Sequence, residues 1–482
     1  MKITLARTDE GAPCSRRPMG GAGIGAISAR RTATRLQKRS VARGRTLLAL
    51  ILIGFHAPTL SALTLDAALA RTLEKNPAII EAKLALEQAA GRRLVLRATG
   101  LPDIRIQGLA GVQGGQRAGD PDTQPFALSR GFFTQPLFDL AVPASRRRGD
   151  VEVLLAQQRL NVAIVGQLHA TRVAYYTALF NNSLLTLGEA QRERLAQNVS
   201  TQLERYQAGR ADRGAMTNAQ LLERELNPRI EQVRRSYDGA LLSLAVTMGN
   251  DLGPATNAVA PEGELQLADP GYDLQAETTA ALARRPDLQL ARLLVRAAGE
   301  DQKIIEAAYY PKIDAVATGV GIPVTIHSAN VGSARSSDNV ISSEVTAGVA
   351  YTWWVVDNGR IGGQVARARA IREMNEICLR QLEANVALEL KRISNNFHAI
   401  EGRRKALSAA IAGAEENVAA VQRTLAEGLS SQLEFRNAEG SFLETKSALL
   451  SAAFQQNVAR AEWDRATGRY FQFSGDTAGK LH

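Results

Sequence analysis

Hydrophobic positions recur at helical spacing over two unusually long stretches, residues 141–208 and 360–427. The first contains proline only at Pro143, and the second contains none. Apolar residues in the second stretch step mostly by three and four: Leu390, Ile393, Phe397, Ile400, Leu407, Ile411, Ala414, Val418, Val421 and Leu425. Such a heptad seam makes helices pack side by side at a shallow angle. Each stretch predicts a helix about 100 Å long. Glycine then marks a turn into a return helix, so we expect two long antiparallel hairpins.

The chain contains two copies of one unit. A constant offset of 209 aligns residues 63–111 with residues 272–320, and an offset of 219 aligns the later parts. The matched pairs include Leu65 and Leu274, Pro77 and Pro286, Pro102 and Pro311, Gly209 and Gly428, and Gly249 and Gly468. A repeat of this length predicts a duplicated architecture. Each copy is predicted to contain a short helix, a second helix, a strand pair, a very long helix and a return helix. We expect repeats at 63–249 and 272–468, a linker at 250–271 and a polar tail at 469–482.

Between the helices the hydrophobic period changes from helical to two. In residues 341–356 the odd positions are mostly apolar, and the even positions are more polar. This alternation is typical of a membrane barrel strand with lipid on one side and water on the other, although a half-buried soluble sheet also fits it. Aromatic residues cluster near the strand ends and are candidate membrane-interface residues: Phe132, Phe133, Phe138, Tyr351, Trp353 and Trp354. Four strands cannot close a barrel, and lipid does not tolerate an open edge. Three chains would supply twelve strands.

The charge is concentrated in one segment. Residues 1–62 hold eleven Lys and Arg residues against Asp9 and Glu10, so they account for +9 of the net charge of +10. This distribution argues against a nucleic-acid-binding patch on the folded part. The basic run ends at Arg45, an apolar segment follows at 46–55, and small residues follow at Ser61 and Ala62. This order predicts a secretory signal peptide over 1–62 with a long basic n-region.

The sequence shows no pattern typical of catalysis or of metal binding. No pair of histidines has metal-ligand spacing, and no phosphate-binding loop or nucleophile motif occurs. Cys14 lies in the leader, which leaves Cys378 alone in the remainder, so no disulfide framework is expected. We predict that the protein is not an enzyme and needs no cofactor and no metal.

The repeated order, the leader and several short motifs resemble the TolC-type outer-membrane factor family, across essentially all of 63–468. The motifs are the helix breaks at Asn76-Pro77 and Arg285-Pro286, the run Tyr309 to Ile313, the run Trp353 to Arg360, and the turn from Gly428 to Ala438. The resemblance implies a mainly α fold with a small β part. Four strands per chain would be pooled in a homotrimer, as a 12-stranded β-barrel in the outer membrane on a helical periplasmic tunnel.

The resemblance also implies a function and partners. It implies a passive exit duct that contacts outer-membrane lipid and works with an inner-membrane transporter and a periplasmic adaptor protein. Its cargo would be small molecules (efflux) or protein (type I secretion). The family closes its tunnel at the helix tips with acidic rings and ionic links. Glu434 falls at the first ring position, whereas Asn437 at the second is not acidic, and the linking pair falls at Ala215 and Ser430. Arg210, Asp212 and Arg213 lie near that position and are candidate substitutes.

A periplasmic coiled-coil adaptor or structural protein with a soluble β domain is the alternative. The two strand pairs with aromatic ends distinguish the two readings, because an adaptor needs neither a lipid-facing pattern nor closure by three copies.

Overall fold

The computed structural model describes residues 63–114, 123–250, 260–265, 273–325 and 339–469. The predicted signal peptide, most of the two strand-connecting loops, much of the linker and nearly all of the polar tail lie outside these residues. The first copy contains α1 (Leu65–Lys75), α2 (Pro77–Ala98), β1 (Asp103–Gly114), β2 (Thr123–Phe138), α3 (Ala141–Gln207) and α4 (Arg213–Thr247). The second contains α5 (Leu274–Arg284), α6 (Pro286–Glu306), a 3₁₀ turn (Ala307–Tyr309), β3 (Lys312–Thr325), β4 (Asn339–Thr352), α7 (Arg360–Glu427) and α8 (Gln432–Thr467). The predicted duplicated order is confirmed.

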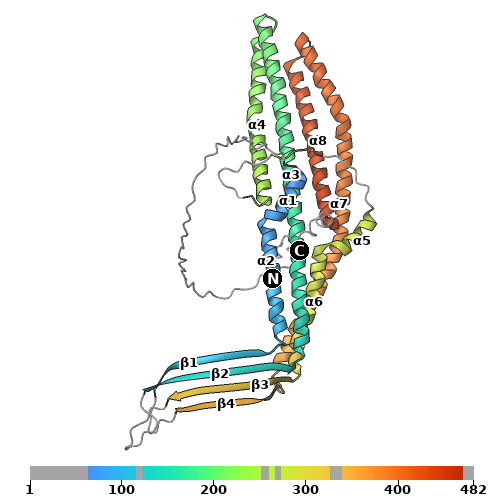
Figure 1. Cartoon of the computed structure of the whole chain (residues 1–482). Helices are drawn as coiled ribbons and strands as arrows, with labels where there is room; N and C mark the ends of the chain where they lie inside the picture. Colours follow the sequence, from blue (N-terminus) through green and yellow to red (C-terminus); the bar gives the residue numbers. More distant parts are fainter. Residues whose placement is uncertain (1–62, 115–122, 251–259, 266–272, 326–338, 470–482) are drawn as a thin grey trace, which may run out of the picture. The chain divides into compact units, whose positions relative to one another are not determined.

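Each copy forms a long antiparallel helical hairpin, α3 with α4 and α7 with α8 (Figure 1). Both hairpins turn at a glycine in the left-handed region, Gly209 with φ +70° and Gly428 with φ +85°. This conformation carries no steric penalty for glycine and lets the chain leave the helix. The second hairpin re-enters through a capping box, in which Ser431 and Glu434 satisfy each other's backbone N–H groups.

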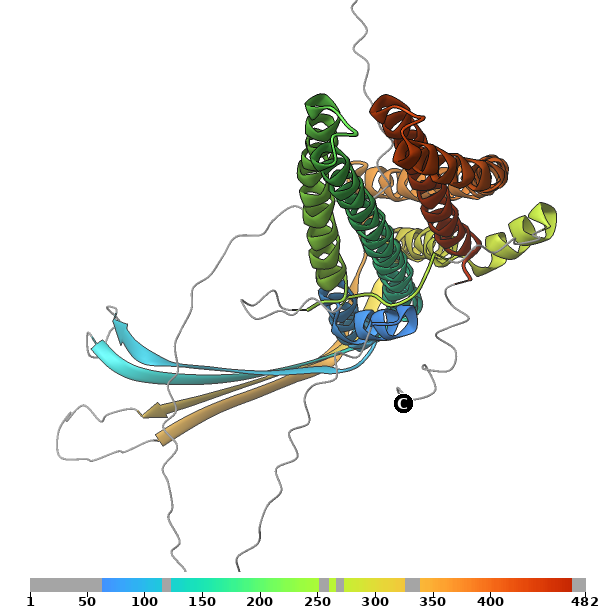
Figure 2. The same cartoon turned by 90° about the horizontal axis from the view of Figure 1, so that it is seen from above.

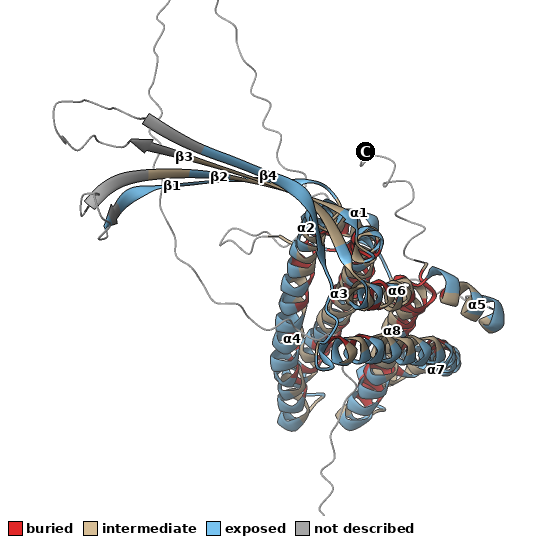
Figure 3. Ribbon diagram, turned by 90° about the horizontal axis from the view of Figure 1, so that it is seen from below, coloured by how far each residue is buried: buried red, intermediate tan, exposed pale blue. Residues whose placement is uncertain are grey.

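Buried residues lie where the helices face one another, and Figure 3 shows the described parts of β1 and β4 and much of α4 and α7 as exposed, whereas β2 and β3 are largely intermediate. One apolar cluster joins the two hairpins: Leu195, Leu226, Ile230, Leu425 and Phe435. The predicted heptad seam contributes Leu390, Ile393, Phe397 and Ile400 to other clusters. Viewed from above, the two hairpins are distinct helix pairs that lie next to each other (Figure 2).

The break between the first two helices of each copy forms a joint with the end of the return helix. In the first copy Asn76 is buried, and its Nδ2 donates to the Thr247 carbonyl at 2.7 Å. In the second copy the corresponding residue, Arg285, donates to the Ala466 carbonyl at 3.2 Å. The sequence offsets of 209 and 219 relate both the donors and the acceptors. The two copies therefore share the geometry of the joint and differ in its chemistry, which is neutral in the first copy and ionic in the second.

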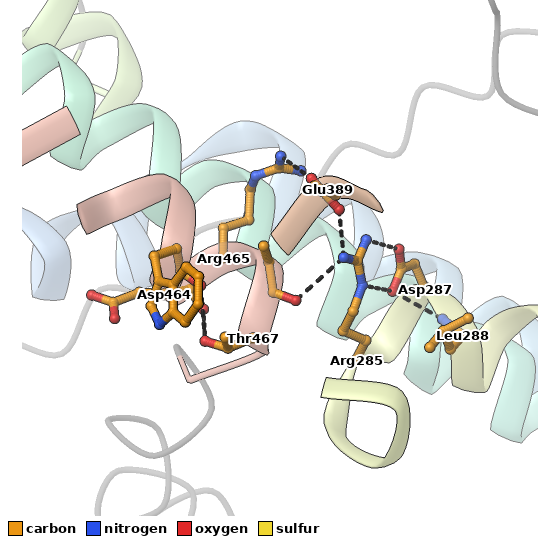
Figure 4. A network of polar contacts seen from close by, with 9 residues as sticks. Arg285, Asp287, Leu288, Glu389, Asp464, Arg465 and Thr467 are labelled. Atoms are coloured by element: carbon orange, nitrogen blue, oxygen red, sulfur yellow. Dashed lines mark hydrogen bonds and ion pairs between the residues drawn. The ribbon is translucent and has the colours of Figure 1, made fainter. Parts of the chain in front are cut away.

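The second joint is a network of charged groups (Figure 4). Arg285 donates to Asp287 at 2.7 Å and to Glu389 at 2.5 Å. Arg465 of α8 donates to the other oxygen of Glu389 at 2.8 Å. Burial alone would lower the pKa of Arg285, but the hydrogen bonds and charges of Asp287 and Glu389 outweigh burial and raise it. The α5–α6 corner is thus fixed to both α7 and α8 through Arg285.

A short segment after the first repeat returns to the start of α1. Leu63, 1% exposed, pairs with Pro261 in a parallel bridge. The Tyr175 hydroxyl lies 3.1 Å from the Leu63 carbonyl oxygen and 2.5 Å from that of Glu262. Burial, together with the charge of nearby acidic groups, raises the pKa of Tyr175 to about 12, so the hydroxyl keeps its proton and remains a donor.

Acidification is expected to weaken the helical part in two steps, the first through His169. Burial lowers its pKa below 6.5, the charges of Arg465 and Arg172 lower it further, and a backbone hydrogen bond at Ala461 opposes them. The unfolded chain therefore binds the proton more readily, so stability falls as the pH drops below about 6.5. His169→Gln should remove this step in thermal unfolding measured between pH 7.5 and 5.

The second acid step comes from two carboxylates in ion pairs. Burial raises the pKa of Glu152, but the hydrogen bond from Arg148 and nearby positive charges outweigh burial, so the net pKa is lowered. The net pKa of Glu300 is lowered in the same way by Lys303 and Arg147. The two ionised carboxylates stabilise the fold above about pH 4.5, and this stabilisation is lost as the pH falls below that value. For the first acid step, the exposed His398→Gln variant is the matched control. If His169→Gln lost stability between pH 7.5 and 5 as the unmodified protein does, His169 would not be the cause of that step.

Candidate functional site

The four strands form one antiparallel sheet in the order β1-β2-β3-β4. Residues directly across a ladder point to the same face, so the register sorts every described side chain into two faces. One face, here called face A, carries no charged residue among the side chains that the structure describes. It consists of Ile104, Ile106, Gly108, Ala110, Val112, Ala127, Ser129, Gly131, Phe133, Gln135, Phe138, Ile313, Ala315, Ala317, Gly319, Gly321, Ser343, Val345, Ala347, Val349 and Tyr351.

The opposite face, face B, carries the charged residues of the described strands. These are Asp103, Arg105, Arg130, Lys312, Asp314 and Glu344. The segregation extends across both copies of the repeat. The alternation in β1 is also clearer in this register than the sequence pattern indicated. An uncharged face opposite a charged one is the arrangement of a strand with lipid on one side and water on the other.

The predicted interface aromatics are divided between the faces. Phe133, Phe138 and Tyr351 lie on face A, with Phe138 opposite Ile313 beyond a β-bulge, whereas Phe132 lies on face B. Trp353 and Trp354 follow the end of β4, so the strand is shorter than the predicted 341–356. The Trp353 indole donates to the Tyr309 carbonyl at 3.1 Å, and the Arg360 guanidinium lies 4.9 Å from the Trp354 ring centroid.

The sheet ends in two unpaired edges within the described chain, because β1 pairs only with β2 and β4 only with β3. Apolar side chains of face A remain exposed on both edge strands, including Ile106 and Val345, which is 79% exposed. Long exposed edges of this kind are templates for pairing with another chain.

The predicted aperture residues of the first hairpin lie at its tip. Arg210, Asp212 and Arg213 are all exposed. The Asp212 carboxylate accepts the backbone N–H of Ala215 at 2.7 Å and so caps α4. Neither arginine forms an ion pair within the part of the chain that the structure describes. A role for these residues at the aperture stays a prediction. Ser430, one of the two positions expected to carry the link, contacts the Thr424 hydroxyl at 2.6 Å.

Glu434 and Asn437 are exposed in the first turns of α8. The Glu434 carboxylate accepts the Ser431 backbone N–H at 3.1 Å, and the Ser431 hydroxyl accepts the Glu434 N–H at 3.2 Å. The side chain thus has a capping role within the helix, which leaves its second oxygen free for a further contact.

The contacts that join the two hairpins come from residues that the sequence analysis did not single out. Arg205 of α3 donates to the carbonyls of Leu425 and Ala426, the latter at 3.1 Å. These carbonyls belong to the last turn of α7, where a helix carries partial negative charge. The Leu425 carbonyl also accepts the Gly428 backbone N–H at 3.1 Å. A guanidinium from one hairpin therefore caps the end of the other.

Further from the tips, α3 and α8 share a buried ion pair. Arg194 donates to both carboxylate oxygens of Glu439, at 2.9 and 3.2 Å. The Glu439 side chain is 2% exposed, and the Arg194 guanidinium lies 5.3 Å from the ring centroid of Phe442. Arg436 also pairs with Glu225 of α4 at 3.1 Å, and Asn198 contacts Gln432. Partners this far apart in sequence carry no local signal, so only the fold reveals them.

Among the residues that the structure describes, no group of His, Cys, Asp and Glu is arranged to hold a metal ion. None of the described helices combines the length and the apolar character needed to cross a membrane.

Comparison with known proteins identifies relatives of this architecture. The profile of the outer membrane efflux protein family matches residues 278–469, which cover most of the second copy. The fusaric acid resistance protein FusA of Burkholderia cepacia is 27% identical over 197 residues, which are 41% of this chain and 36% of that protein. The chain thus spans about a third of the length of this curated relative.

Solved structures share the fold over most of the chain. The outer membrane protein VceC of Vibrio cholerae matches with a TM-score of 0.70 at 19% identity, over 84% of this chain and 96% of that one. The CmeC outer membrane channel of Campylobacter jejuni matches with a TM-score of 0.69 at 14% identity, over 86% and 88%. The profile match and the shared fold agree: the second copy of the repeat matches the outer membrane efflux protein family, and the chain as a whole has the fold of solved outer membrane channels.

Proposed function

We propose that three copies of this chain form a passive exit duct through the outer membrane. The observation that carries the proposal is the uncharged face A, which continues across all four strands and ends in two unpaired edges. Lipid requires every backbone group to be paired, so β1 of one copy would pair with β4 of the next. Three copies give twelve strands, an even number within the range of such barrels. The repeats at 63–249 and 272–468 would each contribute one strand pair and one hairpin.

The duct would work with an inner-membrane transporter and a periplasmic adaptor protein, because neither copy contains a motif for energy conversion.

Small organic molecules are the favoured cargo over secreted protein. Support comes from FusA, whose name describes resistance to fusaric acid. Loss of the gene should then sensitise cells to small toxic acids and leave the secreted proteins unchanged. The opposite pattern would favour type I secretion.

The first test is the mass of the protein extracted from outer membranes in mild detergent, followed by recording in planar bilayers. A particle of three chains with discrete conductance supports the proposal. A monomer that is released with the soluble periplasmic proteins, without detergent, would instead favour the alternative of a coiled-coil adaptor.

We infer that the contacts between the hairpins hold the periplasmic end narrow, with Glu434 of the three copies facing the aperture. Three carboxylates brought together would attract cations. Glu434→Gln should therefore weaken block by divalent cations in bilayer recordings. Glutamine can still complete the capping box with Ser431, so this change isolates the charge from the cap.

Asn437→Asp is the matched gain of charge one turn further along α8, and it should strengthen the same block. Unchanged block in Glu434→Gln would place the carboxylate away from the aperture. Arg210, Asp212 and Arg213 would then remain as the charged residues to test at the first hairpin's tip.

A further inference from the structure

A cavity of about 300 Å³ lies between the first hairpin and α8. Its walls are mostly apolar and come from three helices, with Leu184 and Leu187 on α3, Leu226, Ile230 and Val233 on α4, and Leu443 on α8. This volume is at the lower end of pockets that hold small molecules. Gly188 of α3 also lines the cavity, and a Cβ added there would lie 3.3 Å from Cγ1 of Ile230. A larger side chain at Gly188 would therefore crowd the space.

One cation lines this apolar cavity. Arg229 of α4 is exposed, and it has no carboxylate partner among the described residues. The contrast with Arg234 is informative, because Arg234, further along the same helix, pairs with Glu189 at 3.2 Å and with Glu231 at 3.1 Å. A carboxylate is thus available to the second arginine and not to the first. The cavity combines apolar walls with an unpaired positive charge at its exposed rim.

We propose that this cavity binds a small amphiphilic monocarboxylate, with its apolar body between the hairpins and its carboxylate on Arg229. The charge complementarity selects an anionic head over a cationic one. The apolar walls favour a short alkyl or aromatic body, since burying apolar area supplies most of the binding energy of such ligands.

The position of the cavity gives binding a consequence for the hairpins. Gln191, another lining residue, precedes Arg194 by one turn of α3, and Leu443 follows Glu439 by one turn of α8. A ligand here contacts both sides of the interface that the buried ion pair closes. Because such a ligand binds only while the two hairpins keep this spacing, its binding stabilises that spacing. Binding itself does not depend on the proposed duct, and only the consequence for its periplasmic end rests on that proposal.

The test is photolabelling of the full chain in lipid nanodiscs with a decanoate that carries a diazirine near its tail, followed by peptide mass spectrometry. Label is expected in residues 180–191, 226–233 and 443–447. Arg229→Gln should reduce this label about fivefold, as expected for the loss of a partly exposed ion pair. The exposed Arg235→Gln on the same helix is the matched control and should retain the label.

A second variant tests the apolar part of the site independently. Ser447→Phe places a large side chain at the α8 wall and should abolish the label, whereas Arg229→Gln only reduces it. Unlabelled decanoate should compete with the probe in the unmodified protein. Two results would overturn the proposal: equal labelling by a probe with the same tail and a trimethylammonium head, or label confined to the strands. Circular dichroism and the particle mass of each variant are measured to show that it is folded. A protein that fails to form trimers but is still labelled at this cavity would contradict the proposed duct and leave the proposed site standing.

Discussion

Replacing Arg194 with alanine is expected to weaken the docking of α8 on α3 by about 3–5 kcal/mol, because the change leaves the buried Glu439 carboxylate without its partner. That carboxylate is 2% exposed beside the guanidinium, so the change removes two charge-assisted hydrogen bonds from a largely buried charge. Hydrogen–deuterium exchange of residues 432–446 measures the effect directly. A loss of this size corresponds to exchange at least about 100-fold faster through local opening of the interface.

The double variant Arg194→Met with Glu439→Leu is the control. It removes both charges and fills the space with apolar atoms, so protection should return close to its original level. Arg234→Ala, which breaks the exposed pairs of α4 with Glu189 of α3 and with Glu231, should change exchange little. If Arg194→Ala behaved like that surface variant, the ion pair would not be what holds the hairpins together.

The second large effect is expected in the sheet. Val345→Arg places a charge on the uncharged face A and should cost about 2–4 kcal/mol per chain if that face meets lipid near the bilayer midplane. Val345 is 79% exposed in the single chain and faces Gly319 across the ladder, so steric crowding does not account for a defect. The measured quantity is the fraction of protein that is folded and trimeric in outer-membrane extracts.

Thr346→Arg is the matched control, because the next residue along β4 points to face B, which already carries Glu344 and Arg130. It should assemble normally. Equal assembly of the two variants would indicate that face A meets water or protein, and greater damage from Thr346→Arg would reverse the assignment of the faces.

The bounds of the long helices and the order of the elements could be predicted because they depend on local sequence patterns. The window 141–208 corresponds to α3 at Ala141–Gln207, and the window 360–427 coincides with α7. Proline and glycine limit these helices through backbone chemistry that does not depend on the rest of the fold. The internal repeat then supplied the order of the elements twice, so each copy served as a check on the other.

The contacts at the hairpin tips could not be predicted in the same way. Arg205 acts on backbone carbonyls of α7, which any sequence would provide, and Glu439 lies 245 residues from Arg194. Among many exposed arginines and glutamates on long helices, no spacing distinguishes these from solvated ones. The sequence pattern also predicted the end of β4 too far along the chain. The apolar run continues from Trp353 to Val356, whereas the ladder pairing stops at Thr352.

Each repeat has a joint where the break between its first two helices meets the end of its return helix. A comparison of the two joints shows which feature the copies share. Asn76 and Arg285 differ in size, charge and helix-capping ability, yet both reach a carbonyl in the last turn of the return helix, at Thr247 and Ala466. The retained feature is a backbone acceptor at a fixed place, which no substitution can remove. Each copy was therefore free to change its donor. The neutral joint should be indifferent to ionic strength, whereas the ionic one depends on the carboxylates of Asp287 and Glu389 and should weaken as salt is added.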